Sequence, residues 1–321
     1  MQKRFVFSGL SAVLFVLSLG VAQAADFPEN PFLRDGNWYK ANLHGHTIAS
    51  DGKLTLEERA AEYRGAGYDI IATTDHRITS DVSKVCRDDF LVISGMETHP
   101  KTPNGKDYHF VALNVPQGLH FEDTVPYSEQ LSKLKEAGAS YFIAHPYWSG
   151  FGLEEFRPIA AGAIGVEVYN AGCEGMGCNY SSVHWDDLLG EGFIMPGFAV
   201  DDVHGKGIFG GWVMVKAPEL SLDAVMAALN TGAFYASAGP VLEDVRLEEN
   251  VMTVKCSPVK QIMFMSKRTK GFVKRAPNGG TMTEASWVVK PGLPWVRVEV
   301  IDKNGMHAWA NPIDTSSITE E

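Results

Sequence analysis

Apolar and polar residues are arranged so that strand-like and helix-like segments alternate along most of the chain. Strands are expected at 37–43, 68–74, 90–96, 108–115, 140–144, 164–170, 193–200 and 210–217, and helices at 55–67, 128–138, 182–192 and 221–232. The first helix opens with a capping box, Thr55 to Glu58. Repeated strand-then-helix units predict an α/β fold with a parallel sheet or barrel.

The pattern changes near residues 235–240, and the chain beyond them is strand-like. Apolar segments such as 251–257 and 295–302 are separated by turn-forming breaks ("EEN", "PNGG"), and no helical stretch of useful length follows. We therefore expect a main domain at 25–240 and a small antiparallel β domain at 241–321.

The first residues have the pattern of a secretory signal. Lys3 and Arg4 precede an apolar run, and Ala22 and Ala24 fit the small-x-small rule for cleavage before Ala25. We expect residues 1–24 to be a signal peptide and the protein to be periplasmic or secreted. The alternative is a retained membrane anchor, for which the run is short.

Charge and cysteines add two expectations. With 28 basic and 39 acidic residues the net charge is −11, which argues against nucleic-acid partners and against a membrane surface after signal cleavage. A small anionic substrate remains compatible with this charge. In an oxidising compartment Cys173 and Cys178 are expected to form a disulfide, the alternative being packed thiols.

Residues that bind metals recur at the ends of the predicted strands. His44 and His46 alternate after the first strand, so their side chains should share a face. Active sites of parallel α/β barrels lie at the C-terminal strand ends. The other residues of this kind there are Asp51, Asp75, His76, Glu97, His109, His145, Asp202 and His204. Imidazoles and carboxylates without cysteine suit Zn²⁺, Mn²⁺ or Fe²⁺.

The ordered motifs "NLHGHTIASD", "TTDH", "METH", "AHP", "EVYN" and "DDVH" resemble the PHP (polymerase and histidinol phosphatase) family over residues 38–240. The resemblance implies a distorted seven-stranded TIM-like (β/α)7 barrel that holds up to three divalent metals. It assigns the first metal to His44, His46, Glu97 and Asp202. It assigns the second to Glu97, His109 and His145, and the third to Asp51, His76 and His204. His99 is an alternative to His109, which the family spacing favours.

These assignments lead us to expect an exported metal-dependent phosphoesterase that hydrolyses a small phosphate ester. Glu97 would bridge two cations that share a hydroxide, the nucleophile. Asp75 would either orient a metal ligand or have only a structural role. Arg77 would either bind a phosphate group or be a solvated residue of its loop. The alternatives are a metallohydrolase of non-phosphate esters or amides, and a non-catalytic metal-loaded binding module.

Overall fold

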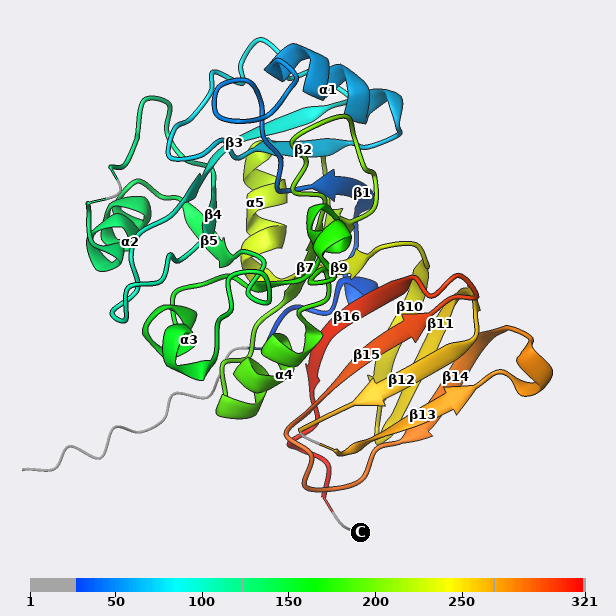
Figure 1. Ribbon diagram of the computed structural model, residues 1–321. Coiled ribbons are helices and arrows are strands. Elements are labelled where there is room, and N and C mark those ends of the chain that lie inside the picture. The colour runs from blue at the N-terminus through cyan, green and yellow to red at the C-terminus, as the bar shows by residue number, and fades with distance from the viewer. Residues whose placement is uncertain (1–26, 123, 268, 320–321) are drawn as a thin grey trace, which may run out of the picture.

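A computed structural model describes residues 27–122, 124–267 and 269–319, so the expected signal peptide lies outside the described residues. The protein has a mixed α/β fold with one large sheet and a separate smaller sheet (Figure 1). Five α-helices are present in the described part: α1 (Leu56–Gly65), α2 (Tyr127–Glu136), α3 (Leu153–Ala160), α4 (Ser182–Glu191) and α5 (Leu222–Thr231). None of these described helices combines the length and apolarity needed to cross a bilayer.

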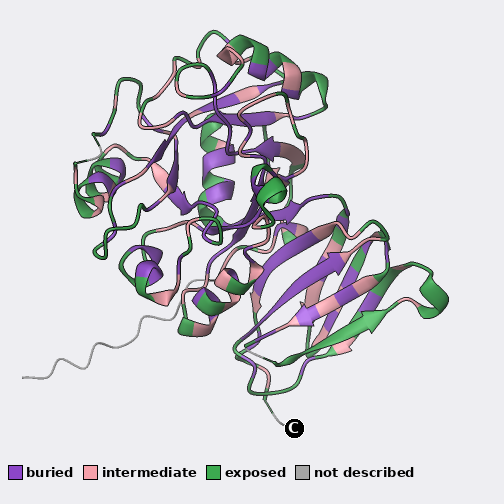
Figure 2. Ribbon diagram, viewed as in Figure 1, coloured by how far each residue is buried: buried purple, intermediate pink, exposed green. Residues whose placement is uncertain are grey.

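The main part of the chain contributes nine strands, which pair in the large sheet. They are β1 (Asn37–Asn42), β2 (Ile70–Thr73), β3 (Leu91–Thr98), β4 (Phe110–Leu113), β5 (Ser140–Ile143), β6 (Val166–Asn170), β7 (Gly197–Val200), β8 (Trp212–Ala217) and β9 (Phe234–Ser237). Strands β1 to β7 are neighbours in sequence order, and β8 and β9 continue the sheet on the other side of β1. Strands β2, β4, β7 and β9 are buried along their whole length, because helices cover the sheet (Figure 2).

Strand β4 departs from the expected parallel order. It pairs antiparallel with both β3 and β5, whereas β1–β2–β3 and β5–β6–β7 pair in parallel. The chain returns from β3 to β4 through a hairpin in which Lys101 pairs with Asp107, and a parallel return would need a longer crossover. As a result, the beginning of β4 lies at the same edge as the ends of β3 and β5.

Closure of the sheet into a barrel remains a prediction. The end of β1 and the end of β7 are connected through one isolated parallel bridge between Gly45 and Val203. Two further backbone hydrogen bonds flank it, from the amide of His46 to the carbonyl of Val203 (2.9 Å) and from the amide of Asp202 to the carbonyl of His44 (3.0 Å). These contacts bring the ends of the first and seventh strands together.

The C-terminal strands are divided between the smaller sheet and one end of the large sheet, and these two parts pack face to face (Figure 1). The smaller sheet contains β10 (Leu242–Glu248), β11 (Val251–Val259) and β14 (Met282–Val288), in which β11 is central. The strands β12 (Gln261–Met265), β13 (Gly271–Arg275), β15 (Trp295–Ile301) and β16 (His307–Asp314) belong to the large sheet, because β16 pairs with β9. The two sheets share a core with residues such as Val254, Phe264 and Val298. The described residues beyond β9 form strands and one short 3₁₀-helix (Pro277–Gly279), and β16 is hydrogen-bonded to β9 of the main part. The expected division into two domains at residue 240 stays a prediction.

Candidate metal centre

Six strands, β1 to β5 and β7, place polar side chains at one edge of the large sheet. His44 and His46 follow β1, His76 follows β2, and Glu97 lies near the end of β3. The remaining members are His145 after β5, and Asp202 and His204 after β7, together with His109. His109 precedes its strand, and it reaches the same edge because β4 runs in the opposite direction.

Four side-chain atoms converge at the centre of this edge with the spacing of metal ligands. Nε2 of His44 lies 3.3 Å from Nε2 of His46, 3.3 Å from Oδ1 of Asp202 and 3.4 Å from Oε2 of Glu97. Nε2 of His46 lies 3.1 Å from the same Asp202 oxygen and 3.5 Å from the same Glu97 oxygen. A tetrahedral ion with bonds of about 2.0–2.1 Å separates its ligand atoms by about 3.3–3.4 Å. The donor set and its spacing therefore fit one divalent ion.

The other oxygen of Glu97 meets a second pair of histidines. Oε1 of Glu97 lies 2.7 Å from Nδ1 of His109 and 3.1 Å from Nε2 of His145. The two oxygens of this buried carboxylate thus point into different histidine groups. Around this carboxylate, His44, Glu97 and His145 form one group that could hold a metal, and His76, Glu97 and His99 form another. The expected second set, with His109, stays a prediction.

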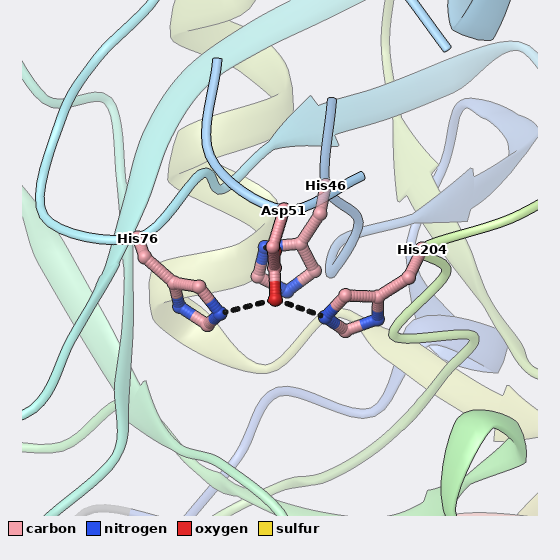
Figure 3. A group of neighbouring side chains, drawn as sticks. All are labelled: His46, Asp51, His76 and His204. Atoms are coloured by element: carbon pink, nitrogen blue, oxygen red, sulfur yellow. Dashed lines mark ion pairs between the residues drawn. The ribbon is translucent and has the colours of Figure 1, made fainter. Parts of the chain in front are cut away.

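A third group surrounds the carboxylate of Asp51 (Figure 3). Its Oδ2 atom lies 3.3 Å from Nε2 of His76 and 3.3 Å from Nε2 of His204. Nδ1 of His46 lies 3.7 Å from Oδ1 of Asp51, and this buried nitrogen has no hydrogen-bond partner among the described residues. The four side chains form a group that could hold a metal, and they match the third set expected from sequence with His46 added.

The electrostatics of the centre favour ionised carboxylates. Burial raises the pKa of Glu97, but the charge of His44 and hydrogen bonds from His109 and His145 outweigh it and hold that pKa well below its ordinary value. The pKa of Asp202 is likewise lowered, because the charge of His44 and the hydrogen bond from His46 outweigh burial. Burial lowers the pKa of His44, yet the surrounding carboxylates, led by Asp202, raise it well above the usual value. A proton on His44 therefore competes with any cation for the same nitrogen.

Three non-glycine residues with a positive φ angle lie at this edge. His145 and Asp202 have φ angles of 22° and 50°, and Arg77 has a φ of 63°. Positive φ is uncommon outside glycine, and such strain gathers at functional sites. At Asp202 the turn separates two adjacent carboxylates. That of Asp201 accepts the amides of Phe209 and Gly210 in the following loop, while that of Asp202 faces the histidines.

Glu167 and Asn170 of β6 hold the ligands in place, a role that strand spacing did not assign. Oε1 of Glu167 accepts from Nδ1 of His44 at 2.7 Å, and Oε2 accepts from the amide of His145 at 2.7 Å and from Nδ2 of Asn170 at 3.0 Å. Asn170 also donates to Oδ2 of Asp202 at 3.1 Å. Because an ionised carboxylate only accepts, Nδ1 of His44 carries a proton and its Nε2 faces the ion position. In the sequence, the only sign of this role was the position of the "EVYN" motif at the end of a predicted strand.

Asp75 and Arg77 lie beside the centre with different contacts. The buried carboxylate of Asp75 accepts from the amide and hydroxyl of Thr47, both at 2.7 Å, and from the hydroxyl of Ser50 at 2.8 Å. It thereby holds the loop between His46 and Asp51 in place. These contacts match the second of the two roles expected for Asp75, that of stabilising the fold. Arg77 is anchored by its backbone amide, which donates to the carbonyl of Glu97 at 2.7 Å. The catalytic roles expected for Asp75, Arg77 and Glu97 stay predictions.

His99 and the two cysteines complete the surroundings. Nε2 of His99 is buried, lies 3.5 Å from Oε2 of Glu97 and lacks a hydrogen-bond partner among the described residues. His99 forms a possible metal-binding group with His76 and Glu97, so the choice between His99 and His109 stays a prediction. Cys173 and Cys178 are free thiols, so the expected disulfide is not formed. The segment that holds them is a short 3₁₀-helix, Ala171–Met176, which ends at Gly177 in the left-handed conformation.

A cavity of about 320 Å³ opens onto this edge. Seven of the nine predicted ligands line it; His44 and His46 lie behind them and are fully buried. Its remaining lining is formed by His99, Trp148, Gly172, Cys173 and Met176. The centre is therefore accessible to a small ligand from one side.

Comparisons with known proteins show similarity only to solved structures. No protein-family model matches the sequence, and no curated protein matches it either. Among solved structures, the chain is similar to a two-domain protein from Bacteroides vulgatus containing a predicted PHP-like metal-dependent phosphoesterase. The two are 19% identical with a TM-score of 0.54, over 88% of this chain and 95% of that one. The resemblance to PHP-like proteins is thereby confirmed at the level of the fold.

Two more distant structures are also similar. A protein from Bifidobacterium adolescentis with a suggested metal-dependent phosphoesterase activity is 15% identical, with a TM-score of 0.43, covering 60% of this chain and 96% of that one. An amidohydrolase from Chromobacterium violaceum, solved with sulfate and no metal, is 15% identical, with a TM-score of 0.41, covering 52% of this chain and 88% of that one.

Proposed function

We propose that the protein is an exported metal-dependent phosphoesterase that hydrolyses a small phosphate ester. The observation that carries the proposal is the convergence of His44, His46, Glu97 and Asp202, whose ligand atoms lie 3.1–3.5 Å apart at the base of an open cavity. A closed structural metal site would leave no such access.

Each residue of the centre has a task in this proposal. His44, His46, Glu97 and Asp202 would hold one ion, Glu97, His109 and His145 a second, and Asp51, His76 and His204 a third. Divalent ions, Zn²⁺, Mn²⁺ or Fe²⁺ by the donor set, supply an activated water at neutral pH and neutralise charge on phosphoryl oxygens. Glu167 keeps His44 in the tautomer that can bind an ion, and Asn170 orients Asp202.

Charge favours a phosphate ester over a neutral amide. Asp51, Glu97 and Asp202 bring three negative charges, and the histidine ligands are neutral when they bind metal. Three carboxylates cannot neutralise three divalent ions, so a filled centre keeps excess positive charge at the cavity base. An anionic phosphoryl group would be attracted there, whereas an amide would gain less.

Turnover of chromogenic esters tests the proposal. The purified protein, loaded in turn with Mn²⁺, Zn²⁺ and Fe²⁺, is assayed with p-nitrophenyl phosphate, its bis ester and p-nitrophenyl acetate, with His44→Ala as the control. We expect metal-dependent release of nitrophenol from a phosphate ester, and loss of at least 100-fold in the variant. Turnover of the acetate alone would indicate a different hydrolase, and no turnover in folded, metal-filled protein would indicate a binding module.

Export is part of the proposal and has a separate test. Residues 1–24 would be removed before Ala25 and the protein released to the periplasm or the medium. Cell fractionation with N-terminal sequencing of the purified protein checks this. A cytoplasmic protein that retains Met1 would contradict it.

A further inference from the structure

The cavity lining consists of two chemically distinct parts. One part is the set of histidines and carboxylates described above. The other part is Trp148, Gly172, Cys173 and Met176, which carry no charged group. At Gly172 a side chain is excluded, because a Cβ atom would lie 2.7 Å from the carbonyl oxygen of Asp202. Beyond the metal-type residues, the lining therefore offers a ligand mainly apolar surface.

Trp148 and Met176 expose this surface. The indole ring stands at 81° to the rings of both His109 and His145, with centroids 5.3 Å and 5.0 Å away, so two ligand histidines fix one side of it. Trp148 nevertheless remains 45% exposed and Met176 62% exposed. Large apolar side chains that line a cavity and stay open to solvent are typical of ligand-binding positions.

The loops that carry the ligands also carry other exposed apolar side chains. Ile48 follows His46 by two residues and Tyr147 follows His145 by two, and Ile48 and Tyr147 are 60% and 50% exposed. Ile208, on the loop after His204, is 43% exposed. Exposed apolar side chains thus occur on three of the loops that also carry predicted metal ligands.

Size limits what this surface can bind. Ligand pockets usually measure about 300–1,000 Å³, so a cavity of about 320 Å³ is at the lower end. A phosphoryl group at the metals occupies part of it, and a space of about 150 Å³ suffices for a benzene ring. The apolar part of the lining offers few hydrogen-bonding partners, so it gives the hydroxyls of a sugar less to bind than it gives a compact apolar group.

We infer that the substrate is a phosphate ester of a small apolar, ring-sized alcohol, whose organic group is bound by Trp148 and Met176. This inference rests on the proposed phosphoesterase function and adds the class of the leaving group. Trp148 would contact the face of the group, and Met176 would adapt to its outline, since methionine fills irregular apolar spaces.

Phosphonates test the inference without dependence on leaving-group reactivity. Binding of benzylphosphonate, methylphosphonate and 2-hydroxyethylphosphonate to the metal-filled protein is measured by calorimetry. We expect benzylphosphonate to bind at least about tenfold more tightly than the other two, from stacking on an aromatic side chain. Trp148→Ala and the exposed-site variant Met176→Ser should each reduce this ratio about three- to tenfold, and Trp287→Ala in β14 should leave it unchanged.

The outcomes separate the two proposals. Equal binding of all three phosphonates, or a ratio unaffected by both variants, would overturn the apolar leaving group while phosphate recognition stands. Failure of every phosphonate to bind metal-filled protein, together with no turnover of phosphate esters, would overturn the proposed function itself. A preference for the hydroxyethyl compound would assign the substrate to polar alcohols instead.

Discussion

Replacement of Glu167 by glutamine should weaken metal binding although Glu167 belongs to none of the three ligand groups. Its two oxygens accept from different donors, Nδ1 of His44 and the amide of His145, each at 2.7 Å. A glutamine has one oxygen and one NH₂ group, so it can satisfy only one of these donors.

Both orientations of the glutamine are unfavourable. With the oxygen toward His44, the NH₂ group faces the amide of His145, and a buried N–H without a partner costs about 1–3 kcal/mol. With the NH₂ group toward His44, the imidazole must accept at Nδ1, which moves its proton to the nitrogen that should bind the ion.

The expected magnitude follows from other metal sites, where loss of such an outer partner costs about 10–100-fold in metal affinity, or about 1.4–2.7 kcal/mol. Competition of the metal-free protein with a chromogenic chelator for Zn²⁺ or Mn²⁺ measures it. Glu154→Gln, at an exposed position of α3, is the matched control. If Glu167→Gln folds and binds the tightest ion as well as the wild type, the proposed orientation of His44 by Glu167 is refuted.

Three further predictions concern separate parts of the molecule. Asp51→Asn should lower the bound metal by about one equivalent per chain, measured by elemental analysis after dialysis; unchanged metal content would contradict the third group. Asp75→Asn should lower the free energy of unfolding in urea by about 1.5–3 kcal/mol, because a charged acceptor is lost; unchanged stability with lost turnover would instead assign it to catalysis. Burial raises the pKa of Glu299, but the hydrogen bond from His307 and the charge of Arg297 outweigh it and lower that pKa. The ionised Glu299 thus stabilises the fold above its unfolded pKa of about 4.3, and this contribution is lost as pH falls through the lower folded value. Thermal unfolding of Glu299→Gln should therefore depend less on pH below about 4.3 than that of the wild type, and equal slopes would contradict the pairing.

The parts of the site that are local in sequence could be predicted from it. The alternation of His44 and His46 follows from strand geometry, and the structure places their Nε2 atoms 3.3 Å apart. Likewise, the capping box of α1 depends only on Thr55 and Glu58, and both of its hydrogen bonds are present. Short-range rules of this kind need no knowledge of the tertiary fold.

The parts that depend on distant segments could not be predicted. Glu167 can contact His44 because the end of β6, which lies between β5 and β7, reaches the same edge of the sheet as the end of β1. The residue spacing within 164–170 contains no information about this neighbour. The direction of β4 depends on whether residues 99–109 form a hairpin or a crossover. Pro103, Asn104 and Gly105 were a turn signal for the hairpin, and they explain why His109 precedes its strand.

The pairing of β16 with β9 has a consequence for any attempt to divide the protein. Strand β16 lies beside β9 at the end of the main part (Figure 1). Ala308 and Trp309 of β16 pair with Ser237 and Ala236, and Trp309 is fully buried. A version truncated at residue 240 would present an unpaired strand edge and an apolar surface to other molecules, which is a template for aggregation. The main part and the C-terminal part should therefore be produced together, because each leaves the other with an unpaired strand edge when it is removed.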